Sequence, residues 1–192
     1  MSNVRSAVRR KISAWFDSVL HWDRRMGHAI GGNRKLNKLD RMFMTATFLG
    51  DGYIWASLAL ALLIFGGSVG RRYVGIGLGV TVANIAIFRL IKTLTGRVRP
   101  ENTAEKAERL RTRIDGYSFP SGHATTSFGL AWVVFNCYPH VAVQTSVYVV
   151  AATIAFSRVF VREHYPLDVL GGAILGSAVA AALFPLLTRL LF

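Results

Sequence analysis

The sequence has little acidic charge and almost no cysteine. Of its 192 residues, 10 are Asp or Glu against 23 Lys or Arg, and Cys137 is the single cysteine. One cysteine cannot form a disulfide framework or a cysteine-based metal site, and its place inside an apolar run indicates a small buried side chain. Charged residues make up only 17% of the chain and hydrophobic residues 52%. These values exclude a disordered chain and disfavour an ordinary soluble domain.

Long apolar blocks dominate the chain instead, and its mean hydropathy is +0.37. The blocks are long enough to cross a bilayer, so we predict an all-α, polytopic transmembrane helical bundle with about five spans. The predicted spans cover residues 53–69 (beginning as early as 42), 73–94, 123–138, 141–160 and 167–192. Residues 42–192 would then form one membrane domain. The frequent glycines within the blocks are explained by close helix packing in lipid.

Residues 1–41 form a basic segment in which charged side chains interrupt every candidate span. Ile12, Phe16, Val19 and Leu20 recur at helical spacing, which predicts an amphipathic helix lying flat on the membrane surface. A partly disordered basic arm is the alternative. The net charge of +13 and the neighbouring spans favour an anionic lipid surface, rather than nucleic acid, as its partner. No cleavable signal peptide is expected, because a short apolar core followed by small residues is missing.

The long polar connection of the predicted bundle covers residues 95–119. Its charge spacing predicts a short solvated helix over Thr103–Arg113. Glu101, Glu105 and Glu108 are interpreted as a solvated face of that helix, since they lack the pattern of ligands for a hard cation.

Three polar clusters stand at the ends of predicted spans. They contain Lys92 and Arg99; Ser121, Gly122 and His123; and Arg158, His164 and Asp168. In a bundle of alternating helical hairpins the three clusters fall on one face of the membrane. Ionisable groups so close to membrane segments are costly and are by default functional.

The residue types in these clusters are suited to binding and attacking a phosphate. Lys92, Arg99 and Arg158 supply fixed positive charge. Ser121 and Gly122 would offer a hydroxyl group and backbone N–H groups at a helix start. An Asp168 carboxylate that accepts one ring N–H of His164 would make the other ring nitrogen a better nucleophile. Their spacing of four residues places both on one helix face, although Pro166 stands between them.

The clusters also carry a family resemblance. Lys92-x6-Arg99-Pro100, Pro120-Ser121-Gly122-His123 and Ser157-Arg158-x5-His164-x3-Asp168 resemble, in order, the three-part motif of the type 2 phosphatidic acid phosphatase superfamily. Val98 departs from that motif, because members commonly have proline there. The family also includes phosphatases with six spans, one more than we expect here.

The resemblance implies a mechanism for the whole set. His164 would attack phosphorus and carry a phosphohistidine, with Asp168 orienting it. His123 would protonate the departing lipid oxygen and later activate water. Lys92, Arg99, Arg158, Ser121 and Gly122 would bind the phosphoryl oxygens, and no metal or cofactor would be needed.

The expected function is therefore an integral-membrane lipid phosphatase. The implied substrates are phosphatidate, phosphatidylglycerophosphate, a polyprenyl phosphate or pyrophosphate, and lipid A phosphate. Three alternatives are a lipid phosphotransferase that uses the same histidine, a non-catalytic lipid-binding protein, and a vanadate-binding haloperoxidase, although the known members of this last group are soluble. The sequence does not indicate an oligomeric state.

The distribution of basic residues bears on the orientation in a cell, or inner, membrane. If the chain crosses the membrane five times, 19 of the 23 Lys and Arg residues share the face of the predicted site. The positive-inside rule then predicts a cytoplasmic site, whereas many relatives act on the opposite side.

Overall fold

The computed structural model describes residues 2–31, 36–100 and 116–192, and no strand occurs among them. The predicted all-α class is confirmed. The elements are α1 (Ser2–Gly31), η1 (Leu36–Leu39), α2 (Asp40–Leu49), α3 (Tyr53–Phe65), α4 (Gly67–Thr95), α6 (Gly122–Cys137), α7 (Val141–Phe160) and α8 (Pro166–Leu191). The short helix predicted over Thr103–Arg113 lies outside these residues.

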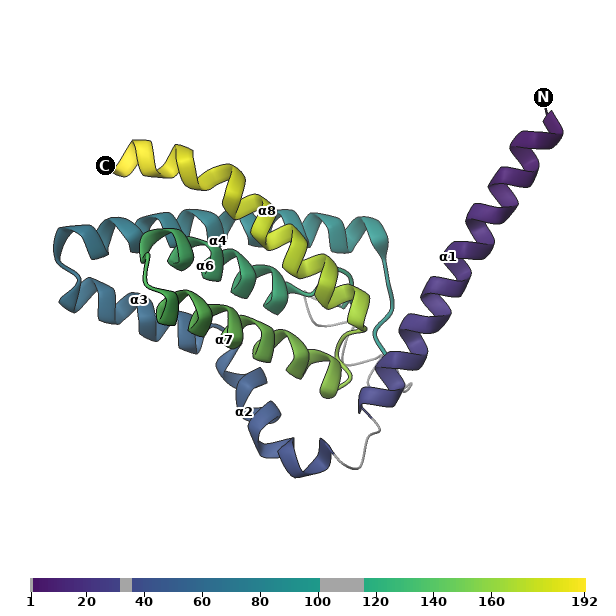
Figure 1. Ribbon diagram of the computed structural model, residues 1–192, viewed down its shortest axis with the longest axis horizontal. Helices are drawn as coiled ribbons and strands as arrows, with labels where there is room; N and C mark the ends of the chain where they lie inside the picture. Colours follow the sequence, from purple (N-terminus) through teal and green to yellow (C-terminus); the bar gives the residue numbers. More distant parts are fainter. Residues whose placement is uncertain (1, 32–35, 101–115) are drawn as a thin grey trace.

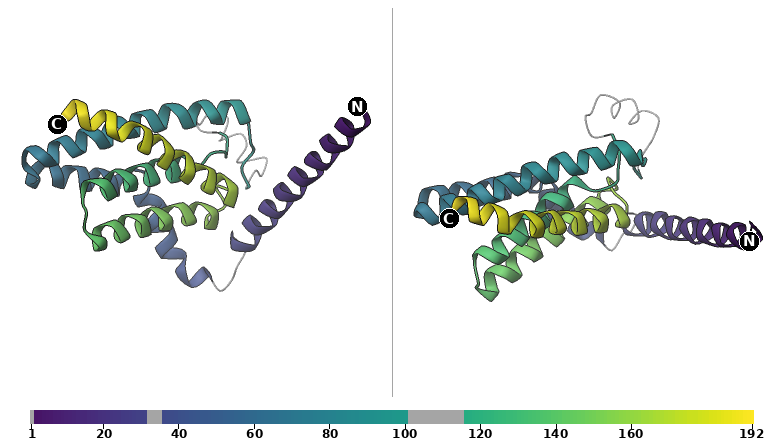
Figure 2. Two further views of the ribbon diagram at one scale, coloured as in Figure 1. Left: turned by 45° about the horizontal axis from the view of Figure 1, so that its top comes forward. Right: turned by 90° about the horizontal axis from the view of Figure 1, so that it is seen from above.

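The helix α6 lies at the centre of the bundle and contacts α4, α7 and α8 (Figures 1 and 2). A buried apolar cluster joins α4, α6 and α8 and includes Ile76, Val80, Val133 and Ala180. The helices α2 and α3 lie outside this core, with α2 against α7 and α3 against α4. Burial of apolar side chains thus fixes the relative positions of the helices that carry the polar clusters.

Glycines in α8 allow α6 and α8 to approach closely. A Cβ atom at Gly172 would lie 2.6 Å from the backbone oxygen of Ser121, and one at Gly176 would lie 2.0 Å from that of Thr125. A larger residue at either position would force the helices apart, so small residues determine this contact. The contact holds the start of α6 beside the start of α8, where two of the polar clusters lie.

The number of membrane spans is approximate. Among the described residues, three helices, α4, α7 and α8, are long and apolar enough to cross a membrane, and the pair α2 and α3, bent by 54°, adds a fourth if it is one span. The remaining predicted span, residues 123–138, corresponds to α6, which is only 16 residues long.

The boundary between the first two predicted spans was placed too late. We expected the break at Arg71 and Arg72, but α3 ends at Phe65 and α4 already begins at Gly67. Gly67 has a φ of 59°, a left-handed conformation that glycine adopts without steric cost. The chain therefore turns at the glycines, and the two arginines lie within α4.

The N-terminal helix α1 projects from the end of the bundle where α6 and α8 begin (Figure 1). Among its described side chains Trp15, Phe16 and Trp22 are exposed, whereas Asp23 and Gly27 are buried. The two buried residues are four positions apart and share one face, which packs at the junction of α7 and α8. A Cβ atom at Gly27 would lie 3.2 Å from the ring of Tyr165.

Candidate active site

The three polar clusters predicted from the sequence lie at the same end of the bundle (Figure 1). Lys92 is in the last turn of α4, Arg99 follows that helix, Ser121 caps α6, Gly122 and His123 begin it, Arg158 is in the last turn of α7, His164 lies in the turn after α7, and Asp168 is in the first turn of α8. The structure therefore brings all eight predicted residues to one region.

Most of these polar side chains are buried. His164 is 1% exposed, Asp168 0% and Lys92 3%, while Arg99 and Arg158 are each 8% exposed. Burying a charge is costly unless an opposite charge and hydrogen bonds compensate for it. A group of cations and a histidine buried together is therefore a candidate functional site.

The turn between α7 and α8 brings His164 back to Arg158. The backbone N–H groups of Glu163 and His164 both donate to the Arg158 carbonyl, at 3.0 and 3.1 Å. Arg162 adopts a φ of 59°, which lets the chain reverse within these few residues. Pro166, which favours the first helical position, then starts α8.

Asp168 lies beside His164, but their contact differs from the predicted one. The His164 Nδ1 atom is 3.6 Å from Asp168 Oδ2, which is too long for a hydrogen bond. Both carboxylate oxygens are engaged elsewhere, since Oδ1 accepts from Arg97 at 2.6 Å and Oδ2 accepts from the Tyr165 N–H at 2.8 Å. Because α8 begins only at Pro166, the pair is adjacent through the helix cap and not through a shared helix face.

The environment of His164 favours its neutral form. Burial lowers the pKa of His164 well below the usual value of 6.5, and the positive charges of Arg99, Lys92 and Arg158 lower it further. A neutral imidazole has an unshared electron pair on one ring nitrogen. The site therefore holds this ring in its nucleophilic form at neutral pH.

The start of α6 can bind an anion. Ser121 is the N-cap residue, and its own N–H donates to the Asp168 carbonyl at 2.9 Å. The unpaired N–H groups of a first helical turn and the helix dipole both favour negative charge. A Cβ atom at Gly122 would lie 3.1 Å from the Phe88 ring, so a residue without a side chain fits best there.

Sequence reasoning missed the acidic partners of the basic residues. Glu163 accepts from Arg99 at 2.5 Å, and its carboxylate is 3.9 Å from Arg158. Asp51, in the turn between α2 and α3, lies 2.7 Å from His123 Nε2. A signal existed for Asp51, because it is an ionisable residue within an apolar block.

Arg97 was also missed, although it stands in the same segment as Arg99. Its guanidinium bridges the carboxylates of Asp168 and Asp23, at 2.6 and 2.5 Å. The sequence did contain a signal, because Arg97 lies between Lys92 and Arg99, two basic residues that were assigned to the site. Nothing in the local sequence distinguished Asp23 from the exposed charges of the same helix.

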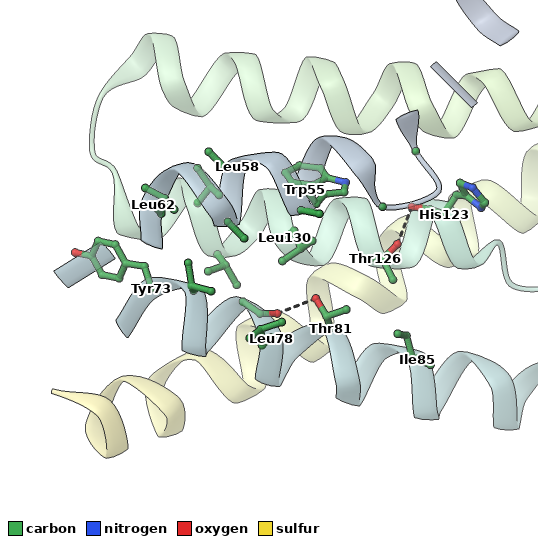
Figure 3. Close-up of a pocket in the computed structure, with 18 of the residues that line it drawn as sticks. Trp55, Leu58, Leu62, Tyr73, Leu78, Thr81, Ile85, His123, Thr126 and Leu130 are labelled. Atoms are coloured by element: carbon green, nitrogen blue, oxygen red, sulfur yellow. Dashed lines mark hydrogen bonds between the residues drawn. The ribbon is translucent and has the colours of Figure 1, made fainter. Parts of the chain in front are cut away.

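An apolar cavity of about 490 Å³ adjoins this site, between α3, α4 and α6. His123 lies at one end of the cavity and Tyr73 at the other (Figure 3). Asp51, 2.7 Å from His123, also belongs to the lining. Along α4 the lining extends from Tyr73 to Arg89, which corresponds to about 24 Å of helix. The cavity is therefore elongated along α4.

Several polar groups in the cavity wall have partners within the protein. Thr81 donates to the Gly77 carbonyl at 2.8 Å, and Trp55 Nε1 donates to Ser127 at 3.1 Å. Thr126 donates to the carbonyl of Gly122 at 3.0 Å. The wall accordingly presents mainly apolar surface, whereas the end at His123 is polar.

These features define a helical membrane protein with a buried cluster of cations and a histidine beside an apolar cavity. A sequence profile described as PAP2 superfamily matches residues 72–191. The chain belongs to the PAP2 superfamily, as the motif resemblance predicted.

Relatives of this chain are lipid phosphatases. It is 32% identical over 162 residues to an undecaprenyl-diphosphatase of Sulfolobus acidocaldarius, a match that covers 79% of this chain and 76% of the relative. It is 33% identical over 152 residues to a decaprenylphosphoryl-5-phosphoribose phosphatase of Mycobacterium tuberculosis, covering 74% and 80% of the two chains. The predicted class of membrane lipid phosphatase agrees with these relatives.

The fold is similar to that of a crystal structure of a PAP2-type phosphatidylglycerolphosphate phosphatase from Bacillus subtilis. The TM-score is 0.68 at 22% identity, and the match covers 90% of this chain and 87% of the other. This likeness shows the fold of the chain.

We predict that the His164 ring stays neutral as the pH is lowered through 6.5. The reason is that burial and the neighbouring cations disfavour the imidazolium form. The measurement is the pH titration of ring ¹H–¹³C NMR signals in detergent. The chain has five histidines, so the signal that disappears in His164→Gln identifies the ring. A midpoint at or above 6.5 would contradict this prediction.

Proposed function

We propose that the chain hydrolyses the phosphate ester or pyrophosphate of a membrane lipid at the site built around His164. The observation that carries the proposal is the position of the apolar cavity, which ends at His123 and so adjoins the cationic cluster. A lipid phosphate has one charged end and one apolar end. The site and the cavity match these two ends.

The proposed chemistry uses two histidines. The Nδ1 atom of His164 faces Asp168, which leaves Nε2 to attack phosphorus. The N–P bond forms as the lipid O–P bond breaks, and His123 donates a proton to the departing oxygen. Water, deprotonated by His123, then breaks the N–P bond and releases phosphate.

The cationic residues would stabilise the charge on the phosphoryl oxygens. Arg99 and Arg158 suit bidentate contacts, and Lys92 adds a point charge. Ser121 and the backbone at Gly122 would add donors at the start of α6. In this proposal the charge that develops in the transition state is met by groups that are already oriented.

Among the substrates considered, we propose a polyprenyl phosphate or pyrophosphate first. The two relatives with at least 30% identity described above are named for undecaprenyl and decaprenyl lipids. The elongated form of the cavity along α4 also suits the one long chain of a polyprenyl lipid, in contrast to the several chains of phosphatidate, phosphatidylglycerophosphate or lipid A phosphate.

A phosphate-release assay with purified protein in detergent and EDTA tests the activity. We expect release from polyprenyl phosphates to exceed release from diacyl lipids. His164→Ala should lower kcat by roughly a thousandfold or more, because the attacking atom is lost. His140→Ala is a matched control, since this exposed histidine precedes α7.

Two outcomes would contradict the proposal. Equal activity of the wild type and His164→Ala would exclude the histidine mechanism. Release that occurs only when a second lipid accepts the phosphoryl group would favour a phosphotransferase.

We further propose that Glu163 occupies the anion site when substrate is absent. Its carboxylate contacts both Arg99 and Arg158, two of the proposed phosphate ligands. A phosphoryl group that binds these arginines must displace it. Glu163 would therefore weaken binding of phosphate while it keeps the arginines oriented.

Glu163→Gln should tighten competitive inhibition by inorganic phosphate by roughly tenfold, because a hydrogen bond between charged groups is lost from the ligand-free state. The measurement is the inhibition constant in the same assay. Asp40→Asn, which removes an exposed carboxylate in the first turn of α2, controls for net charge. Unchanged or weaker inhibition would show that Glu163 does not compete.

We also propose that the site faces the cytoplasm of an inner membrane and that α1 contacts anionic lipid. The basic residues concentrate on the face of the predicted site, which includes the N-terminal segment. Trp15, Phe16 and Trp22 expose aromatic surface on α1. Aromatic and basic side chains together favour the interface of an anionic membrane.

Cysteine labelling tests the orientation, because the single native cysteine is buried. Asp17→Cys, on exposed α1, should react with a membrane-impermeant maleimide only after cells are disrupted. Ser68→Cys, at the opposite end of the bundle, should react in intact cells. The reverse pattern would place the site outside.

A fluorescent dye attached to the Asp17→Cys variant tests the contact of α1 with lipid. Its emission should shift to the blue in anionic nanodiscs, and the shift should revert in high salt.

A further inference from the structure

The helix α1 contributes a buried charge to the candidate active site. Asp23 is 0% exposed although it lies in the last third of a helix whose neighbouring side chains face solvent. A buried carboxylate needs partners. Both of its oxygens have one, since Oδ1 accepts from the Leu167 N–H at 2.8 Å and Oδ2 accepts from Arg97 at 2.5 Å.

Arg97 connects this carboxylate to Asp168. Its two terminal nitrogens donate to different residues, Nη2 to Asp23 and Nη1 to Asp168 at 2.6 Å. The guanidinium also lies 4.5 Å from the centre of the Tyr165 ring, a distance typical of a cation–π contact. We call Asp23, Arg97 and Asp168 the arginine bridge.

The bridge restricts how the Asp168 carboxylate can turn. Arg97 holds Oδ1, and the Tyr165 N–H holds Oδ2 at 2.8 Å. Oδ2 is the oxygen that lies 3.6 Å from His164 Nδ1. Rotation of the carboxylate would break both hydrogen bonds, so the same oxygen remains directed at His164.

We infer that Asp23 and Arg97 are positioning residues for the reaction at His164. This inference rests on the proposed function, because it assumes that Asp168 supports His164 during phosphoryl transfer. Asp23 orients Arg97, Arg97 orients Asp168, and Asp168 orients the ring of His164. Docking of α1 is thereby coupled to the geometry of the nucleophile, more than 100 residues away in sequence.

Asp23→Asn tests the bridge with almost no change of side-chain volume. An amide has only one acceptor oxygen, so either Arg97 or the Leu167 N–H faces another donor. We expect kcat to fall about ten- to a hundredfold, because a small misplacement near the reacting groups has a large effect. The KM should stay within about twofold, since the proposed phosphate ligands remain in place.

Matched variants separate this effect from general changes. Asp17→Asn makes the same substitution at an exposed position of α1 and should leave kcat unchanged. Asp23→Glu keeps the negative charge and should recover part of the lost activity. Arg97→Lys keeps the positive charge but not the two-pronged geometry, so we expect a loss similar to that of Asp23→Asn.

A double-mutant cycle tests whether the two residues act together. The variant with both Asp23→Asn and Arg97→Lys should lose little more activity than either single variant. Additive losses would overturn the coupling. Wild-type kcat in Asp23→Asn, or an equal loss in Asp17→Asn, would overturn the positioning role.

The ring signal of His164 gives a readout that does not depend on activity. Asp23→Asn should shift its ¹H–¹³C NMR signal, and Asp17→Asn should not. An unshifted signal in Asp23→Asn would overturn the inference even if no lipid is hydrolysed. If the signal shifts but the wild type releases no phosphate, the bridge stands and the proposed function fails.

Discussion

Burial of opposite charges at one end of a helical bundle determines much of this structure. Lys92, Arg99 and Arg158 are each at most 8% exposed, and burying such groups costs several kcal/mol per ion unless counter-charges are present. Carboxylates from three separate segments contact Arg97, Arg99 and Arg158. The turn after α7, the start of α8 and the docked face of α1 are therefore held together by the same electrostatic requirement.

Helix packing makes this arrangement of charges possible. The starts of α6 and α8 must come close enough for the Ser121 N–H to reach the Asp168 carbonyl at 2.9 Å. Gly172 and Gly176 permit that approach, because any side chain there would meet the backbone of α6. The apolar cluster further along these helices keeps them aligned. The polar geometry at the edge of the membrane core thus depends on the helix packing within it.

Much of this arrangement was predictable from the sequence. Apolar blocks indicated the helices, and the spacing of the motif residues indicated that three distant clusters meet. Apart from Asp51, the acidic partners were not predictable, because a pairing such as Asp23 with Arg97 depends on how α1 docks. The helix break at Gly66 and Gly67 was placed too late because adjacent arginines gave a stronger polar signal than glycines. The contact between His164 and Asp168 differed because Pro166 starts a new helix.

The loose attachment of α3 bears on how such a protein can change its substrate over evolution. This helix forms one wall of the cavity, yet none of its residues is buried. The side chains proposed to bind phosphate belong to other segments, from α4 to α8. Mutations in α3 can therefore alter the length or shape of the tail that fits without disturbing the reacting groups. Selection for a new lipid and retention of the chemistry are separable in this architecture.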